Sequence, residues 1–333
     1  MRTAVVLAAI LLVPARGFGA QGEGSSGALL ARLPVGARSE AMGGNHGTLL
    51  QSAEAFLVNP AAVLLADKAV LESSYHQAAG MDYGGILYVQ PFGGSFALGF
   101  GVEALSAGTI EAWDYFGNIS EALLQEDRLG TLAAAVKMGF VDIGGSVKYY
   151  ESVLVEREKA RALFFDAGAV VKLDLSAKLQ RWRSGSPAWL ILSASVCNMG
   201  NTIDYVSSGD SAPLSTRFGI SFTRDYLSRQ RVAFAGAVVV RRSTAKPEAY
   251  CGGEYSWLGP VELSLRAGFK ARQGMGAVCS GIGLRYRAVA FHYAYVTGDP
   301  VLGGSHHGAV EFTPADIWRG DEDDWTSPLP PRP

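Results

Sequence analysis

Apolar and polar residues alternate along most of this chain from about residue 68 onward. In the segment that begins at Val261, apolar residues at every second position alternate with Glu262, Ser264 and Arg266. Successive side chains of a β-strand point to opposite faces, so this pattern predicts strands with one apolar and one polar face. About fourteen such segments follow one another. They are expected at approximately 68–77, 83–92, 94–105, 129–140, 142–154, 161–173, 188–198, 214–223, 230–241, 247–257, 261–271, 277–287, 288–296 and 306–313.

Two folds accommodate such strands. In a soluble β-sandwich the apolar faces of two sheets pack together, whereas in an outer-membrane barrel they face lipid around a polar lumen. The N-terminus favours the membrane, because Arg2 precedes an apolar run over 4–13 and small residues follow up to Ala20, as in a cleaved signal peptide. We therefore expect an all-β protein, an antiparallel transmembrane β-barrel of about fourteen strands with an N-terminal plug. The soluble sandwich is the alternative.

The expected organisation has four parts: a signal peptide at 1–20, a hatch or plug at 21–67, the barrel at 68–313 and a polar periplasmic tail at 314–333. Outer-membrane barrels alternate short periplasmic turns with longer outside loops. The longer connectors at 106–128, 199–213 and 297–305 fall outside if the N-terminus is periplasmic, as expected. The connector at 174–187 is an exception, because it is long where a periplasmic turn is expected.

Composition supports a barrel that encloses a plug. Glycine makes up 41 of the 333 residues, and charged residues make up 18%, below the usual value of about 25%. Glycine relieves crowding on a curved wall and lets a strand approach a plug closely. The net charge of −2, without a basic patch interleaved with aromatics, argues against nucleic acid as a partner.

The two faces of the expected strands differ in charge. The lipid-facing set is expected to contain Phe96, Leu98, Phe100, Val102, Leu132, Ala134, Val136, Met138, Phe140, Phe218, Ile220 and Phe222. The lumen-facing set contains acids and bases in about equal number, which predicts ion pairs in a filled or narrow barrel rather than a strongly ion-selective pore. Its basic members of interest are Lys148, Arg217, Arg266, Lys270 and Arg285.

A motif precedes the first strand. Residues 36–44 read GARSEAMGG, and after an apolar stretch residues 59–62 read NPAA. This arrangement resembles the N-terminal hatch signature of the FadL-like outer-membrane superfamily, which includes long-chain fatty acid transporters and the PorV-type proteins of a bacterial secretion apparatus. Gln51 and Ser52 stand where an acidic pair is usual, and Ala62 replaces a glycine. The resemblance implies a plugged barrel that admits hydrophobic molecules, holds them near the hatch and releases them through a gap in the wall.

Within the motif, each residue type suggests a role. Gly43 and Gly44 permit a sharp bend or a close approach to the wall. Asn59 before Pro60 is a turn signal that would reverse the chain into the first strand. A capped helix packed against a sheet is the alternative reading of this segment. The apolar pocket that the resemblance implies would be lined by Phe56, Leu57 and Val58, and a fatty carboxylate would need a basic partner among Lys148, Arg217, Arg266 and Arg285.

Enzyme chemistry has no support in the sequence. The chain has no nucleophile elbow, zinc-helix spacing, phosphate loop or dinucleotide fingerprint, so we expect neither an enzyme nor a bound metal or cofactor. Cys197, Cys251 and Cys279 lie in separate strand segments and are expected to be small buried or wall-facing thiols. A bridge between Cys251 and Cys279 would require their strands to meet.

These observations predict a protein of the bacterial outer membrane, surrounded by its lipid, that takes up hydrophobic compounds such as long-chain fatty acids. A PorV-type adaptor role is the alternative, in which the barrel binds a secretion-system or periplasmic protein instead of passing cargo. A surface adhesin is a further alternative, and it rests on the loops at 106–128 and 199–213 alone.

Overall fold

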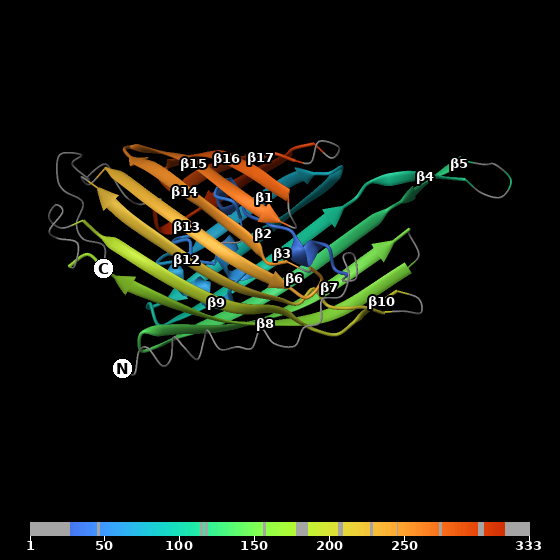
Figure 1. The fold of residues 1–333 in the computed structure, drawn as a ribbon, viewed down its shortest axis with the longest axis horizontal. Coiled ribbons are helices and arrows are strands. Elements are labelled where there is room, and N and C mark those ends of the chain that lie inside the picture. The colour runs from blue at the N-terminus through green and yellow to red at the C-terminus, as the bar shows by residue number, and fades with distance from the viewer. Residues whose placement is uncertain are drawn as a thin grey trace.

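The computed structural model describes residues 27–44, 47–113, 116, 119–155, 158–177, 186–205, 209–226, 229–244, 246–272, 275–298 and 303–316. The predicted signal peptide and the tail beyond residue 316 lie outside these residues. Within the described chain, fourteen antiparallel strands form one closed barrel (Figure 1). They are β1 (Val70–Ala78), β2 (Met81–Phe92), β3 (Phe96–Ser106), β6 (Gln125–Met138), β7 (Val141–Leu154), β8 (Glu158–Asp174), β9 (Ala188–Gly200), β12 (Ser215–Tyr226), β13 (Gln230–Arg241), β14 (Glu248–Leu258), β15 (Val261–Arg272), β16 (Met275–Tyr286), β17 (Val289–Val296) and β18 (Ser305–Phe312).

The strand order follows the chain, and the ring closes where β1 pairs with β18. The predicted fold class and strand count are therefore confirmed, and the soluble sandwich is excluded. Two small hairpins lie within connectors that the sequence pattern left without structure. They are β4 (Thr109–Trp113) with β5 (Ile119–Leu123), and β10 (Ile203–Asp204) with β11 (Gly209–Asp210).

The outer wall is apolar and the inner wall is polar. Phe100 and Ile220 are half exposed on the outside, whereas Glu254 and Arg266 are buried on the inside. The predicted outward positions Phe96, Leu98, Val102, Leu132, Val136, Met138 and Phe140 are exposed as well. A closed ring leaves no unpaired strand edge, and an apolar outer band suits hydrocarbon. The protein therefore lies in the bacterial outer membrane.

The two ends of the barrel differ in their connectors. One end, here called the loop end, carries the connectors at 107–124, 201–214 and 297–304. The other end, called the turn end, carries the tight turns at 93–95, 139–140, 259–260 and 287–288. In outer-membrane barrels the longer loops face outward, which makes the loop end extracellular. The long connector at 175–187 lies at the turn end, and residues 178–185 of it are outside the described chain.

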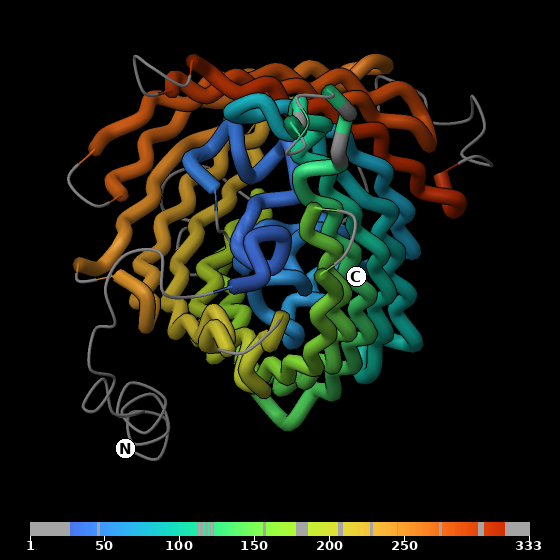
Figure 2. The backbone as a smooth tube through the Cα atoms, turned by 90° about the vertical axis from the view of Figure 1, so that its right-hand side faces the viewer, coloured from blue at the N-terminus to red at the C-terminus, as the bar shows by residue number. Residues whose placement is uncertain are grey.

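The described residues before β1 lie inside the barrel. Figure 2 looks along the barrel and shows this segment, in blue, surrounded by the strands. Its helical turns are η1 (Leu30–Arg32), α2 (Ala37–Ala41), η2 (Glu54–Leu57) and η3 (Pro60–Leu65), and η5 (Pro314–Asp316) follows β18. We call residues 27–67 the hatch. No helix in the described part of the chain is long and apolar enough to cross a membrane.

The hatch runs through the lumen from one end to the other. Leu30 packs among Tyr83, Tyr150 and Ile203 at the loop end. α2 then packs against β15–β18, and η3 against β2, β3 and β6–β8 on another part of the wall. From there the chain reaches the turn end and enters β1 at Val70. The described hatch therefore starts at the loop end, not in the periplasm as the strand orientation alone suggested.

A candidate functional site where the hatch meets the wall

Two pairs of glycines form notches in the inner wall that receive the backbone of the hatch. Gly252 of β14 and Gly268 of β15 face each other in the strand register. A Cβ at Gly252 would lie 2.6 Å from Met42 Cα, and one at Gly268 would lie 2.8 Å from the Met42 carbonyl oxygen. No side chain fits at these distances, so glycine is required for the hatch to lie flat on the wall. We call this pair the Met42 notch.

The second pair is Gly144 of β7 and Gly168 of β8, which also face each other. A Cβ at Gly144 would lie 2.5 Å from the Ala61 nitrogen, and one at Gly168 would lie 3.1 Å from Pro60 Cδ. We call this pair the Ala61 notch. The two notches receive the two halves of the sequence motif, which gives these wall glycines a packing role.

Asn59 and Pro60 act together at the Ala61 notch. The Asn59 side chain accepts a hydrogen bond from the Ala61 N–H at 3.0 Å, and its amide donates to the carbonyls of Ala169 and Ala194 at 3.1 and 3.3 Å. Asn59 thus caps η3 and ties it to the wall. Pro60 begins η3, and the chain reaches β1 only at Val70, so this short helix separates the turn signal from the first strand.

Gly43 and Gly44 shape the hatch at the Met42 notch. Their φ angles are +95° and +87°, in the left-handed region that side chains disfavour. A Cβ at Gly43 would also lie 2.7 Å from the Cys251 carbonyl oxygen and 2.8 Å from that of Phe269. The bend and the close approach to the wall both require glycine here, as the motif suggested.

Ion pairs hold α2 in place beside the Met42 notch. Arg38 of the hatch donates two hydrogen bonds to Glu254 of β14, at 2.8 and 2.9 Å, and Arg266 of β15 donates to the same carboxylate at 2.6 Å. On the other side of α2, Glu40 pairs with Lys270. Arg38 is mostly buried, and the other four groups are almost entirely buried. Burial alone would lower the pKa of Arg38, but the Glu254 carboxylate raises it, so the guanidinium stays charged.

The lumen cations predicted from the sequence are buried or half-buried inside the barrel, and most have a carboxylate partner. Lys148 pairs with Asp166 at 2.8 Å and also donates to the Leu57 carbonyl. Arg285 pairs with Glu311, whereas Arg217 donates to the Ser215 hydroxyl at 3.3 Å. Ion pairs across a filled lumen are therefore present, as the balanced charges predicted.

The apolar part of the hatch is packed tightly. Phe56 has no exposed surface and lies against the wall beside Val63, over Gly99 and Gly101. Leu57 and Val58 line an enclosed cavity of only about 30 Å³. Ligand pockets usually measure about 300–1,000 Å³, so cargo could reach these three residues only if the hatch moved.

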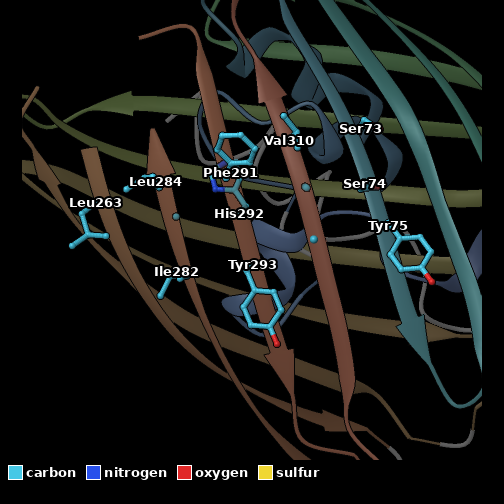
Figure 3. A pocket seen from close by; sticks show the side chains of 13 residues that line it. Ser73, Ser74, Tyr75, Leu263, Ile282, Leu284, Phe291, His292, Tyr293 and Val310 are labelled. Carbon is cyan, nitrogen blue, oxygen red and sulfur yellow. The ribbon is translucent and has the colours of Figure 1, made fainter. Parts of the chain in front are cut away.

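Larger spaces lie nearer the turn end. A lumen cavity of about 430 Å³ is lined by charged groups, among them Arg38, Arg266 and Glu311. On the outside, Tyr75, Phe291 and Tyr293 border an apolar depression of about 670 Å³ across β15–β18 and β1 (Figure 3). The two spaces share Gly283, Leu284 and His292, so the wall between them is a single layer of chain. The wall gap implied by the resemblance is not open, because the described strands close the ring.

The three cysteines are unbridged, and His76 contacts both a second histidine and the hatch. Cys197 and Cys279 are buried and Cys251 is exposed, and all three are free thiols, as the sequence suggested. β15 separates the strands of Cys251 and Cys279. His76 contacts His307 at 2.9 Å and the Val35 carbonyl at 2.6 Å, so it joins the closing strands to the hatch. Within the described residues, no group of three or more metal-ligating side chains occurs.

Glu54 gives the hatch a pH-dependent stability. Burial raises the pKa of its carboxyl to about 7, and Glu40 adds to this, while Arg38 and the Ser39 N–H oppose it. A raised pKa means that the folded state binds the proton more tightly. The free energy of unfolding should therefore fall as the pH rises from about 4.5 to about 7. In a Glu54→Gln variant this fall should be smaller, as measured by urea midpoints across that range. An unchanged pH dependence would contradict this role.

The sequence reading missed Arg38, Glu40 and Glu54 as hatch contacts. Two of them, Arg38 and Glu40, lie inside the GARSEAMGG motif, where charges between small residues were the available signal. Their wall partners Glu254 and Lys270 are more than two hundred positions away in the chain. Local patterns therefore marked the segment but not its partners.

No protein-family model matches this chain, and no curated protein does so in sequence. Among solved structures, the Ralstonia pickettii toluene transporter TbuX is similar over 84% of this chain and 98% of its own, with 12% identity and a TM-score of 0.50. The Pseudomonas putida toluene transporter TodX covers 84% and 96%, with 11% identity and a TM-score of 0.46. A Pseudomonas aeruginosa FadL homologue covers 82% and 94%, with 9% identity and a TM-score of 0.44.

At such identities the likeness to TbuX concerns the fold. This chain is a plugged outer-membrane barrel, and its fold resembles that of TbuX.

Proposed function

We propose that this protein is a channel through which hydrophobic compounds enter across the outer membrane, with the hatch as its plug. The observation that carries the proposal is the way in which the lumen is closed. A separate segment, not a strand of the wall, fills it and rests on two glycine notches and the buried ion pairs of Arg38 and Glu40. Such a segment can shift without breaking the barrel, because no strand pairing depends on it.

The fold of TbuX, a protein described as a toluene transporter, supports the same class of cargo. Long-chain fatty acids are the finer assignment that we propose. The apolar side chains of Phe56, Leu57 and Val58 would meet the cargo once the hatch shifts. Of the four basic candidates for the carboxylate, Lys148, Arg266 and Arg285 already have acidic partners. The apolar contacts would therefore dominate recognition.

Locking the hatch tests the proposal. A Cβ at Gly99 of β3 would lie 2.9 Å from Val63 Cγ1. In a disulfide each sulfur lies about 3 Å from the partner's Cβ, so Val63→Cys with Gly99→Cys fits a bridge between η3 and the wall. Cells that lack their own hydrophobic-compound channels should take up labelled oleate when they make the native protein. The double variant should lose this uptake when oxidised and regain it after reduction.

The two single cysteine variants and the native protein serve as controls under both conditions, because three native thiols are present. Uptake of labelled toluene, measured in parallel, separates the cargo classes. Uptake of toluene but not of oleate would support the channel and contradict the fatty acid assignment. Equal uptake by the oxidised and reduced double variant, with the bridge verified, would contradict gating by the hatch. If uptake of both compounds were no greater than in cells without the protein, the proposal that this protein is a channel would be contradicted.

A further inference from the structure

A serine and two histidines form a chain of hydrogen bonds where the barrel closes. Ser305 and His307 lie on the lumen face of β18, and the Ser305 hydroxyl is 2.8 Å from His307 Nε2. His307 Nδ1 is 2.9 Å from Nδ1 of His76, which faces it across the pairing of β1 with β18. His76 Nε2 is 2.6 Å from the Val35 carbonyl oxygen of the hatch. We call Ser305, His307 and His76 the seam triad.

The Val35 carbonyl decides which nitrogen of each histidine carries the proton. A carbonyl oxygen only accepts hydrogen bonds, so a neutral His76 is protonated at Nε2 and has a lone pair at Nδ1. His307 must then donate from Nδ1, which leaves a lone pair at its Nε2. The Ser305 hydroxyl donates to that lone pair. His307 is therefore in the tautomer that can take a proton from the serine, as a base does for a serine nucleophile.

The two histidines differ in how well each could hold a second proton. His76 has no exposed surface, and its ring stacks on Tyr83 with 4.8 Å between the centroids. No carboxylate of the described chain lies within ion-pair distance of it, so a positive charge at His76 would be costly. His307 is 2% exposed, but the carboxylate of Glu40 lies 3.8 Å from its Nε2. A proton taken from the serine would therefore stay on His307.

Ser305 is the member of the triad that a ligand can reach. It is the first residue of β18 and follows the connector at 297–304, at the loop end. Its surface is partly exposed, whereas both histidines are buried. The two residues before it, Gly303 and Gly304, have no side chains that could cover its hydroxyl. A molecule outside the cell can thus meet this hydroxyl without passing the hatch.

We propose that Ser305 is an activated nucleophile that cleaves carboxylic esters at the extracellular mouth of the barrel. The serine oxygen forms a bond to the ester carbonyl carbon, and its proton passes to His307 Nε2. The bond from that carbon to the alcohol oxygen then breaks, and the alcohol leaves with the proton from His307. Water next attacks the acyl-serine, its proton passes through His307 to the serine oxygen, and a carboxylic acid leaves. No atom changes its oxidation state.

Esters are the substrate class that this arrangement fits. An alcohol leaves a tetrahedral carbon more readily than an amine does, so an ester needs less additional stabilisation than an amide. The activity goes beyond the proposed channel, because it involves neither the passage of cargo nor a movement of the hatch. No sequence motif marked the triad, since 231 positions separate His76 from His307 in the chain.

Labelling with a fluorescent alkyl fluorophosphonate tests the site in the full-length, detergent-folded protein, because this probe bonds covalently to activated serines. We expect the native protein to be labelled at Ser305, as located by peptide mass spectrometry, and to hydrolyse p-nitrophenyl butyrate. Ser305→Ala should abolish the labelling and lower the rate of hydrolysis about a hundredfold or more. His307→Gln should lower both rates by a similar factor, through the loss of the base. The heat-modifiable mobility of each variant reports whether its barrel is folded.

His76 is a positioning residue in this proposal, and its role has a spectroscopic signature. Nitrogen-15 NMR of the histidine-labelled protein should show that His307 is protonated at Nδ1. His76→Phe keeps an aromatic ring beside Tyr83 but removes the acceptor for this proton. In that variant the Nδ1 tautomer should lose its preference, and labelling of Ser305 should slow about tenfold or more. An unchanged tautomer with an unchanged labelling rate would overturn the role of His76.

His306→Gln is the matched control. His306 lies between the two triad members of β18, but its side chain points outward and contacts the Tyr293 hydroxyl. Labelling and hydrolysis in this variant should equal those of the native protein. Absence of labelling in the native protein, or labelling that persists in Ser305→Ala, would overturn the proposal. So would labelling of Ser305 without hydrolysis of the ester. None of these measurements depends on uptake, so their failure would leave the proposed channel untouched.

Discussion

Replacing Gly144 by valine is expected to drive the hatch off the wall and leave an ion-conducting pore. Gly144 faces the lumen at the Ala61 notch, where a Cβ would lie 2.5 Å from the Ala61 nitrogen and 2.6 Å from the Pro60 carbonyl carbon. These are backbone atoms, which cannot rotate away as a side chain could. Overpacking typically costs about 1–3 kcal/mol, and here the barrel wall is the more rigid partner. The hatch should therefore give way, and Asn59 should lose its bonds to the wall.

The neighbouring glycine provides the control. Gly145 lies on the same strand but faces lipid, and the nearest atom to a Cβ there is the Asp166 carbonyl oxygen at an ordinary 3.6 Å. Gly145→Val makes the same chemical change one position away and should leave the protein closed. Conductance in planar bilayers and protease sensitivity of the hatch would be compared for the two variants. A closed, protease-resistant Gly144→Val protein would show that the notch does not hold the hatch.

Most of the barrel could be predicted from the sequence because its physics is local. Each strand must present an apolar face to lipid and a polar face to the lumen, so apolar and polar residues alternate within each strand segment. The segment predicted at 261–271 is β15 (Val261–Arg272), and that at 142–154 is β7 (Val141–Leu154). The largest differences are at β6 and β8, which begin several residues before the predicted segments at the loop end, and at β12, which ends at Tyr226 instead of residue 223 at the turn end.

The hatch contacts could not be predicted in the same way because they join distant parts of the chain. The motif pointed to Gly43, Gly44 and Asn59 through their backbone preferences. It could not show that the glycines of the wall face them, since that depends on strand register. Phe56 illustrates the limit: its apolar character was plain, but only the structure shows that Gly99 and Gly101 leave room for its ring and that no open pocket surrounds it.

Glu254→Gln is expected to cause a large loss of stability in this protein. The carboxylate is 4% exposed and accepts hydrogen bonds from Arg38 of the hatch and Arg266 of the wall. Removing its charge leaves two buried guanidinium groups without their shared counterion. Breaking a buried ion pair in this way typically costs about 3–5 kcal/mol. The midpoint of urea unfolding, followed by the heat-modifiable mobility of the folded barrel, should fall accordingly.

An exposed ion pair gives the comparison. Glu151 pairs with Arg161 at 3.1 Å, but the Arg161 side chain is 64% exposed. Glu151→Gln should therefore change stability by no more than about 1 kcal/mol. A loss as small as this in Glu254→Gln would mean that the buried network does not hold the hatch.

A double variant separates the contribution of the hatch from that of the wall. Arg38→Gln alone removes the hatch partner and leaves Glu254 paired with Arg266 at 2.6 Å. Adding Arg38→Gln to Glu254→Gln removes one of the two uncompensated cations, so the double variant should be more stable than the sum of the single losses predicts. Additive losses would mean that Arg38 and Glu254 act independently. A double variant that is more stable than additivity predicts would locate the stabilisation in the contact between the hatch and β14. This is the contact that must break when α2 leaves the Met42 notch.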